Sequence, residues 1–187
     1  MHVTRGDIPE ILIIDPRVFG DDRGFFLETW SSSRYAEAGL PPTFLQDNMS
    51  RSVRGTLRGL HLQHPNGQGK LVYVIEGEVF DVAVDVRVGS PTFGRWFGIA
   101  LSGRNKRQVY IPPGFAHGFC VTSEYALFAY KCTETYRPET ELGILWNDPA
   151  IGVRWPTSAT VLSEKDRAYP PLADIPQSRL PRYETAA

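Results

Sequence analysis

Apolar and polar residues alternate in short runs along most of the chain, and turn-forming residues separate these runs. Residues 79–86 show the pattern best, because Phe80 and three valines share one parity while Asp81 and Asp85 share the other. Alternation with a period of two predicts a β-strand. The same reasoning predicts strands at residues 11–14, 25–30, 56–63, 70–76, 96–101, 108–111, 117–121 and 125–136. Many short strands separated by turns predict an all-β fold, and we expect an antiparallel jelly roll.

Helix signals are few. Residues 31–38 begin with serines and are followed by Gly39, and residues 163–168 begin with Ser163, so we expect a short serine-capped helix at each place. Residues 170–187 are rich in proline and polar side chains, and we expect a tail that wraps the surface or frays. The length of 187 residues fits one domain that covers residues 1–187.

Composition narrows the class of partner. The formal net charge of -1 gives no reason to expect nucleic acid or an anionic membrane as a partner. Two cysteines, Cys120 and Cys132, are too few for a disulfide scaffold and favour a reducing compartment. The first residues lack the apolar core of a signal peptide, and no apolar run is long enough to span a bilayer. We therefore expect a cytoplasmic location.

The first candidate for chemistry is the histidine of the predicted strand at residues 56–63. Strict alternation places Arg58 and His61 on opposite faces of that strand. Gly59 lies between them and offers a place for a β-bulge that would turn both side chains into one cavity. The ordinary alternative is a partly buried, hydrogen-bonded histidine without a catalytic role.

A second histidine, His117, follows the turn of residues 112–114. The two histidine segments are similar to the two halves of the cupin motif, many members of which bind a metal through three histidines and a carboxylate. Here Gln63 stands where a second histidine of the first half is expected, so only His61 and His117 are plausible ligands. Two histidines beside the Lys70 ammonium make a poor metal site. We therefore expect a cupin without a bound metal.

Three further side chains have both an ordinary and a chemical interpretation. Lys70 opens an apolar strand, either as an edge lysine or as a fixed cation where negative charge develops. Tyr130 and Tyr136 share a parity, and they serve either as core aromatics or as proton donors in an apolar site. Asp166 follows Ser163 by three residues, which is the spacing of a capping box but also provides a carboxylate that could orient a histidine.

At this point the chain resembles the dTDP-4-dehydrorhamnose 3,5-epimerases, which are metal-free cupins of deoxysugar synthesis. The resemblance covers residues 8–166 and rests on eight motifs in the family's order. They are FGDDRGFF at residues 19–26, QDN at 46–48, LRGLH at 57–61, GEVFDVAVD at 77–85, SPTFG at 90–94, NKRQ at 105–108, GFAHGF at 114–119 and WNDP at 146–149. The resemblance implies inversion of C3 and C5 of dTDP-4-dehydro-6-deoxy-D-glucose to give dTDP-4-dehydro-L-rhamnose, without a cofactor.

The resemblance also implies a role for each candidate. His61 matches the family's base, Tyr130 matches its acid on the opposite face of the sugar, and Asp166 matches the carboxylate paired with the base. Lys70 and Arg58 would surround the C4 oxygen. The positions that hold the nucleotide or the sugar match Arg23, Glu28, Gln46, Asp47, Asn48, His117, Glu141 and Lys165. Family members are homodimers that exchange N-terminal strands, so Arg23 and Glu28 would serve the partner's site.

The residue types suit this reaction. The C4 ketone acidifies the hydrogens at C3 and C5, and an imidazole titrates near neutral pH, as a base requires. A cation fixed near O4 stabilises the enolate more than the neutral ketone. An arginine suits the diphosphate. Phe25 or Phe26 could stack on thymine, and Gln46 or Asn48 could bond to it, but the sequence does not choose among them.

The chain departs from the family pattern at three places, and three rival functions stay open. Leu62 follows His61 where an aromatic residue is common, Tyr73 replaces a frequent arginine, and the loop between Gln63 and Lys70 is about one residue short. These changes concern pocket shape. The rivals are an epimerase that inverts only C3 or C5, a metal-dependent cupin oxygenase or isomerase, and a sugar-binding cupin without activity.

Overall fold

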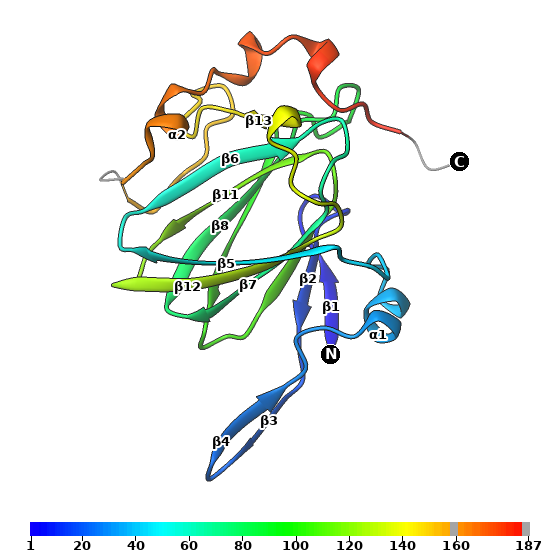
Figure 1. Ribbon diagram of the computed structural model, residues 1–187, viewed down its shortest axis with the longest axis vertical. Coiled ribbons are helices and arrows are strands. Elements are labelled where there is room, and N and C mark those ends of the chain that lie inside the picture. The colour runs from blue at the N-terminus through cyan, green and yellow to red at the C-terminus, as the bar shows by residue number, and fades with distance from the viewer. Residues whose placement is uncertain (158–160, 185–187) are drawn as a thin grey trace.

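The computed structural model describes residues 1–157 and 161–184 and confirms the all-β, cupin-type jelly roll with a few short helices (Figure 1). Two antiparallel sheets face each other. The six-stranded sheet has the order β1 (His2–Arg5), β2 (Leu12–Asp15), β10 (Gln108–Ile111), β7 (Lys70–Glu76), β12 (Tyr125–Cys132) and β5 (Gln46–Val53). The five-stranded sheet has the order β13 (Glu141–Gly143), β6 (Leu57–Gln63), β11 (Phe115–Val121), β8 (Glu78–Asp85) and β9 (Trp96–Ser102).

A separate hairpin of β3 (Val18–Asp21) and β4 (Gly24–Leu27) projects from the body of the molecule (Figure 1). The helices are α1 (Ser32–Glu37) and α2 (Glu164–Ala168), with 3₁₀ turns at Pro138–Thr140, Leu172–Asp174 and Gln177–Arg179. Both predicted helices are confirmed. The Ser163 hydroxyl caps α2 as expected, but Ser31 makes no side-chain cap bond at α1, so that part of the prediction is wrong.

The main core lies between the sheets, and two smaller clusters cover their outer faces. The inter-sheet core is built from residues such as Val72, Ala83 and Phe128. The other face of β8 presents Val82 and Val84 to the C-terminal segment, which explains why β8 is buried on both sides. Leu172, Ile175 and Leu180 are buried there, so the described part of the tail wraps the surface. Helix α1 packs through Tyr35 against β2 and β10 in the third cluster.

Four strands were missed by the alternation argument, and two were predicted too long. Strand β5 carries the polar sequence QDNMSRSV at the edge of its sheet, and β1, β3 and β13 have only three or four residues each. The predicted strand at residues 125–136 ends at Cys132, so Tyr136 lies outside it and its shared parity with Tyr130 has no meaning. Tyr136 is half exposed. The predicted strand at residues 25–30 ends at Leu27.

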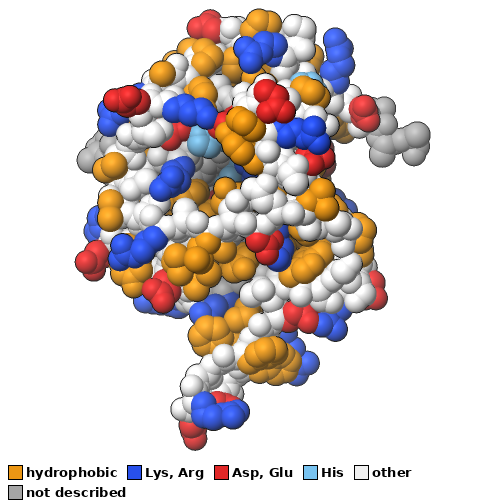
Figure 2. Space-filling view, in the orientation of Figure 1, with side chains coloured by type: hydrophobic (Ala, Val, Ile, Leu, Met, Phe, Trp, Pro, Cys, Tyr) orange, Lys and Arg blue, Asp and Glu red, His pale blue; other side chains and the backbone are white. Residues whose placement is uncertain are grey.

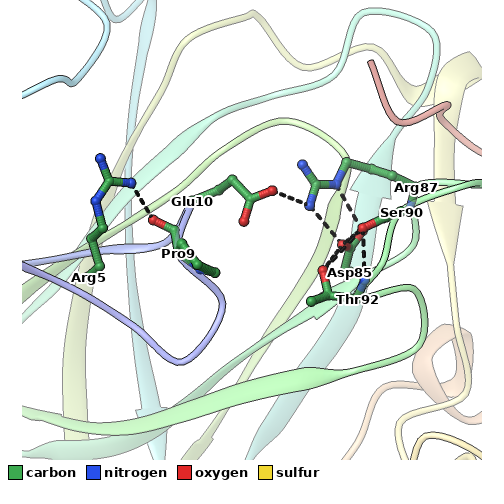
Figure 3. A network of polar contacts seen from close by, with 7 residues as sticks. All are labelled: Arg5, Pro9, Glu10, Asp85, Arg87, Ser90 and Thr92. Atoms are coloured by element: carbon green, nitrogen blue, oxygen red, sulfur yellow. Dashed lines mark hydrogen bonds and ion pairs between the residues drawn. The ribbon is translucent and has the colours of Figure 1, made fainter. Parts of the chain in front are cut away.

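The end of β8 carries a buried polar network (Figure 3). The Asp85 carboxylate accepts hydrogen bonds from Arg87, Ser90 and Thr92, and Arg87 also donates to Glu10 at 3.0 Å. Burial alone would raise the pKa of Asp85, but these donors hold that pKa below its ordinary value. The network joins the loop before β2 to the turn after β8, and its polar groups are well satisfied.

Candidate active site

A β-bulge at Gly59 sets the direction of the strand that carries the first histidine. On β11, Phe119 pairs with Arg58 and His117 pairs with His61, so three steps along β6 face two steps along β11. Gly59 has φ +134, and a Cβ there would lie 2.5 Å from the Gly118 Cα. The extra residue changes the parity of β6, and Arg58 and His61 line one cavity. The bulge proposed from the sequence is therefore confirmed.

His61 and Asp166 form a hydrogen-bonded pair, although they are far apart in the chain. The His61 Nε2 lies 2.5 Å from Asp166 Oδ1, and the Ser163 hydroxyl donates to Asp166 Oδ2 at 2.8 Å. Burial disfavours the charged carboxylate, but the bonds from His61, Ser163 and the Gly59 amide outweigh burial and lower the pKa of Asp166. An ionised Asp166 accepts a hydrogen bond from the Nε2–H group, so Nδ1 is the basic nitrogen of His61. Ser163 and Asp166 thus act both as a helix cap and as part of a dyad.

Two adjoining cavities of about 310 and 290 Å³ surround this pair between the sheets. His61, Lys70, Tyr130 and Glu141 line both of them. Figure 2 shows histidine side chains in a hollow on this face, with side chains of both charges around its rim. His61 comes from β6 of one sheet, and Tyr130 comes from β12 of the other. The site is therefore a pocket with a candidate base and a candidate acid on facing walls.

Burial changes the pKa of both Lys70 and Tyr130, in opposite directions. Burial lowers the pKa of the Lys70 ammonium, and nearby Cys132, Asp81 and Glu141 oppose this change. Burial raises the pKa of the Tyr130 phenol, so Tyr130 keeps its proton at neutral pH. A protonated phenol can donate a proton, and a buried cation stabilises negative charge strongly because little water screens it.

His117 forms a second histidine–carboxylate pair on the wall of the same cavity. Its Nε2 lies 2.8 Å from Asp81 Oδ2, and both side chains are buried. The imidazole stacks on Phe128, with ring centroids 6.2 Å apart. His117 pairs with His61 across the two strands, so the two dyads stand next to each other.

Glu141 organises the rim of the site. Its carboxylate accepts hydrogen bonds from Lys165 Nζ and from the Tyr136 hydroxyl, both at 2.6 Å. Burial opposes ionisation of Glu141, but these donors hold its pKa below the ordinary value. The same contact raises the pKa of Lys165. The rim therefore carries a charged pair that an incoming anion could rearrange.

The predicted QDN motif divides between the cavity and the outside of the sheet. Gln46 and Asn48 line the cavity, and Gln46 Nε2 donates to Asn48 Oδ1 at 2.9 Å. Asp47 has the opposite parity on β5 and pairs with Lys131 Nζ at 2.7 Å, with an exposed side chain. The structure brings Gln46 and Asn48 to the site of their own chain but leaves Asp47 outside it.

Arg23 and Glu28 also lie away from this cavity. Arg23 pairs with Asp21 on the projecting hairpin, and Glu28 pairs with Arg34 of α1. Neither lines the cavity that holds His61. Their predicted role in binding stays a prediction, and it requires the site of another subunit.

Several residues that line the cavity or contact His61 were missed by the sequence argument. Phe128 and Cys132 share the parity of Tyr130 on β12, so the same alternation rule identifies them. Tyr169, whose ring meets the His61 ring edge to face at 5.7 Å, follows a short helix and gives no periodic signal. Among the described residues, no group of three or more histidine, cysteine, aspartate or glutamate side chains could hold a metal ion. Within residues 1–157 and 161–184, no helix is long and apolar enough to cross a membrane.

Comparison with known proteins gives one consistent result. The sequence profile of the dTDP-4-dehydrorhamnose 3,5-epimerases matches residues 5–174. The dTDP-4-dehydrorhamnose 3,5-epimerase of Pseudomonas aeruginosa is 57% identical over 176 residues, which cover 93% of this chain and 97% of that protein. The enzyme of the same name from Escherichia coli is 53% identical over 169 residues, covering 89% and 91% of the two chains.

A solved structure agrees with these sequences. The dTDP-6-deoxy-D-glucose-3,5-epimerase of Legionella pneumophila, in complex with dTDP-4-keto-L-rhamnose, superposes with a TM-score of 0.96 at 53% sequence identity. The match covers 98% of this chain and 99% of that one. The fold, the paired carboxylate and histidine, and these matches lead to one conclusion: the chain belongs to the dTDP-4-dehydrorhamnose 3,5-epimerase family.

Proposed function

We propose that this protein is an isomerase that inverts C3 and C5 of dTDP-4-dehydro-6-deoxy-D-glucose and forms dTDP-4-dehydro-L-rhamnose. The observation that carries the proposal is the His61–Asp166 dyad, which faces Tyr130 across a cavity that also holds Lys70. The relatives named dTDP-4-dehydrorhamnose 3,5-epimerase support this choice of substrate. The Legionella pneumophila relative holds the proposed product in its crystal structure.

His61 begins each inversion as the base. Its Nδ1 takes the hydrogen from the carbon next to the ketone, and the electron pair of that C–H bond forms an enolate with charge on O4. Asp166 holds the imidazole in one orientation and stabilises the imidazolium that results. Positioned proton transfer of this kind is typically worth about 10² to 10⁴ in rate.

Lys70 and Arg58 stabilise the enolate. Both line the cavity with His61, and both present donors that carry positive charge. Their attraction for O4 grows as that oxygen becomes an anion, which lowers the barrier instead of merely tightening binding. The ketone already supplies the acidity of the C–H bond, so the reaction needs no redox cofactor and no metal.

Tyr130 completes the inversion from the other wall. Its phenol donates a proton to the face of the enolate opposite His61, which reverses the configuration at that carbon. The enzyme then holds a protonated His61 and a Tyr130 phenolate, and exchange with water restores both before the next inversion. The new hydrogen in the product therefore comes from solvent.

The nucleotide binds through the polar residues around the cavity. Gln46 and Asn48 offer amide groups, and Lys165 offers a cation for the diphosphate. His117 and Glu141 line the cavity and bind the sugar in this proposal. Asp47 lies on the outer face of β5 and pairs with Lys131, so it does not reach the cavity of its own chain. In this proposal, Asp47 binds substrate only at the site of a neighbouring subunit.

We also propose that the protein acts as a homodimer that exchanges its N-terminal hairpin. Phe25 and Phe26 are 58% and 69% exposed on β4, and a two-stranded hairpin is marginal when it stands alone. A partner that covers this hairpin would receive Arg23 and Glu28 at its own cavity. Light scattering should give about twice the 21.0 kDa of one chain at micromolar concentration, and a monomer would contradict the exchange.

A cytoplasmic location is the remaining part of the proposal. Cys120 and Cys132 are free and buried, as in proteins kept in reducing compartments. Detection of the native protein in the cytoplasmic fraction of the source cells tests it.

The experiment that tests the activity uses deuterated water. The protein is mixed with dTDP-4-dehydro-6-deoxy-D-glucose, and proton NMR follows the signals at C3 and C5. We expect deuterium at both carbons together with signals of the L-rhamno product. Deuterium at a single carbon would support the single-site epimerase, and binding without any exchange would support a sugar-binding cupin.

A further inference from the structure

Two aspartates on β8 have matching positions but different surroundings. Asp81 and Asp85 are four residues apart on one face of the strand, and their exposed fractions are 1% and 0%. Asp85 receives donors from Arg87, Ser90 and Thr92 on both carboxylate oxygens, as Figure 3 shows. A carboxylate with this many donors is explained by the structure that it holds together.

Asp81 lacks such an explanation. Its Oδ2 is bonded to His117 Nε2, but its Oδ1 is buried and has no hydrogen-bond partner among the described residues. Buried carboxylate oxygens are normally satisfied, because an unpaired one loses its bonds to water. His117, which holds Asp81, lines the active-site cavity, so an unsatisfied carboxylate oxygen at this place points to a role in the site.

Lys70 is a buried-site cation that, in the part of the chain that the structure describes, also lacks a polar partner. Its ammonium lines the cavity and has no hydrogen bond or ion pair among the described residues. Burial lowers its pKa, and the groups that counter this effect are Cys132, Asp81 and Glu141 in that order. Burial also raises the pKa of the Cys132 thiol, so Cys132 is neutral at neutral pH. Lys70 shares one face of β7 with Val72, and Asp81 shares one face of β8 with Ala83. Val72 and Ala83 both pack in the inter-sheet core, so Lys70 and Asp81 point into the same space between the sheets.

The other ionisable groups around the cavity do not replace Asp81. Arg58 and Lys165 are cations, and Tyr130 keeps its proton. Asp166 is committed to His61 and Ser163. Glu141 is committed to Lys165 and Tyr136 at the rim. His61 and His117 add no negative charge.

We propose that Asp81, clamped by His117, is the fixed counter-charge that keeps Lys70 a cation on the inner wall of the active site. Asp81 is thus a positioning residue that acts through Lys70 and does not touch the substrate. This role rests on the proposed function for its importance in catalysis, but the electrostatic pairing is a property of the protein alone.

The test is a titration of Lys70 by NMR in the folded protein without substrate. The chain has four lysines, Lys70, Lys106, Lys131 and Lys165, so lysine labelled with carbon-13 at the ε position gives four signals. The Lys70 signal is the one missing from Lys70→Arg. We expect its titration midpoint to move to lower pH in Asp81→Asn, while the signals of Lys106 and Lys131 keep their midpoints.

Asp85→Asn is the matched control, because it removes a buried charge from the same face of the same strand. It should lower the melting temperature and leave the Lys70 midpoint where it is in the parent. If Asp81→Asn does not fold, Asp81→Leu removes the same charge with an apolar side chain that has the same branching at Cγ. A folded neutral variant at position 81 with the parent's Lys70 midpoint would overturn the proposal.

The kinetic consequence is measured separately. In Asp81→Asn, the fall of kcat at rising pH should begin at lower pH than in the parent, because activity needs the Lys70 cation. If neither protein epimerises the substrate, the proposed function fails, yet the NMR shift still decides the pairing. A shifted Lys70 signal with an unchanged kcat profile would refute the catalytic part of the inference.

Discussion

The bulge at Gly59 makes a prediction that joins backbone geometry to activity. Gly59 has φ +134, a region that side chains rarely adopt, and a Cβ at this position would lie 2.9 Å from the His117 carbonyl oxygen and 2.5 Å from the Gly118 Cα. Gly59→Ala therefore introduces both backbone strain and a collision with the neighbouring strand. The collision is with backbone atoms, which cannot rotate away as a flexible side chain would.

The expected magnitude follows from these two terms. A residue held in a sparsely populated backbone region costs about 1–3 kcal/mol. Overpacking of a tight site adds typically about 1–3 kcal/mol. The sum is about 4 kcal/mol in the middle of the range, and for a chain of this size that lowers the melting temperature by roughly 12 °C.

Gly39→Ala is the control for strain without collision. Gly39 follows α1 with φ +91, and a Cβ there would meet no atom within 4 Å. Its substitution should cost about 1–2 kcal/mol, or roughly 5 °C. Thermal unfolding of parent and variants at one protein concentration gives both shifts, and deuterium exchange at 20 °C reports whether His61 and Arg58 still share the cavity.

The reasoning predicts a clear order of effects. Gly59→Ala should lose more stability than Gly39→Ala and should also lose activity, while Gly39→Ala should keep the parent's rate. Equal melting temperatures for the two variants would show that the close approach to β11 does not matter. Full activity in a destabilised Gly59→Ala would show that the bulge does not organise the site.

Three further predictions concern the site itself. His61→Ala should reduce deuterium exchange at C3 and C5 by about 10² to 10⁴ while dTDP binding measured by calorimetry stays close to the parent's, and exchange at the normal rate would remove His61 from the mechanism. Asp166→Asn should destabilise the protein by about 2 kcal/mol at pH 7. Because the pKa of Asp166 is lower in the folded state, this difference should begin to shrink below the ordinary value of 3.8 and should be lost as the pH falls through the pKa of the folded state; denaturant unfolding of the two proteins from pH 7 to pH 3 follows this decline. Dialysis against a chelator should leave the epimerisation rate unchanged, whereas a loss restored by a divalent metal would favour the metal-dependent cupin.

The sequence predicts the fold well where alternation is strong. The alternation in residues 79–86 predicts strand β8 correctly. One face of β8 packs in the inter-sheet core and the other packs against the C-terminal segment, so both faces are apolar apart from Asp81 and Asp85. The same rule fails at β5, which is an edge strand with polar residues at six of its eight positions. There, pairing with β12 determines the conformation, and the local sequence carries little sign of it.

The site shows a similar division. Arg58 and His61 are brought together by a bulge that the glycine between them suggests, and Asp166 is identified through a cap that also serves the dyad. The pairing of Asp81 with His117 depends on the register between β8 and β11, which no local pattern encodes. Arg23 and Glu28 pair with Asp21 and Arg34 away from the cavity of their own chain, so a role in binding requires the cavity of a second subunit.

The most direct test of the central claim is Tyr130→Phe in deuterated water. The claim is that His61 and Tyr130 act from facing walls, one removing a proton and the other returning it. The variant keeps the ring and its packing but lacks the acid, while His61, Lys70 and Arg58 still form the enolate. NMR should then show washout of hydrogen that clearly exceeds net inversion, with inversion at C5 reduced most. If Tyr130→Phe inverts both carbons at the parent's rate, Tyr130 is not the acid, and the account of the two facing walls is wrong.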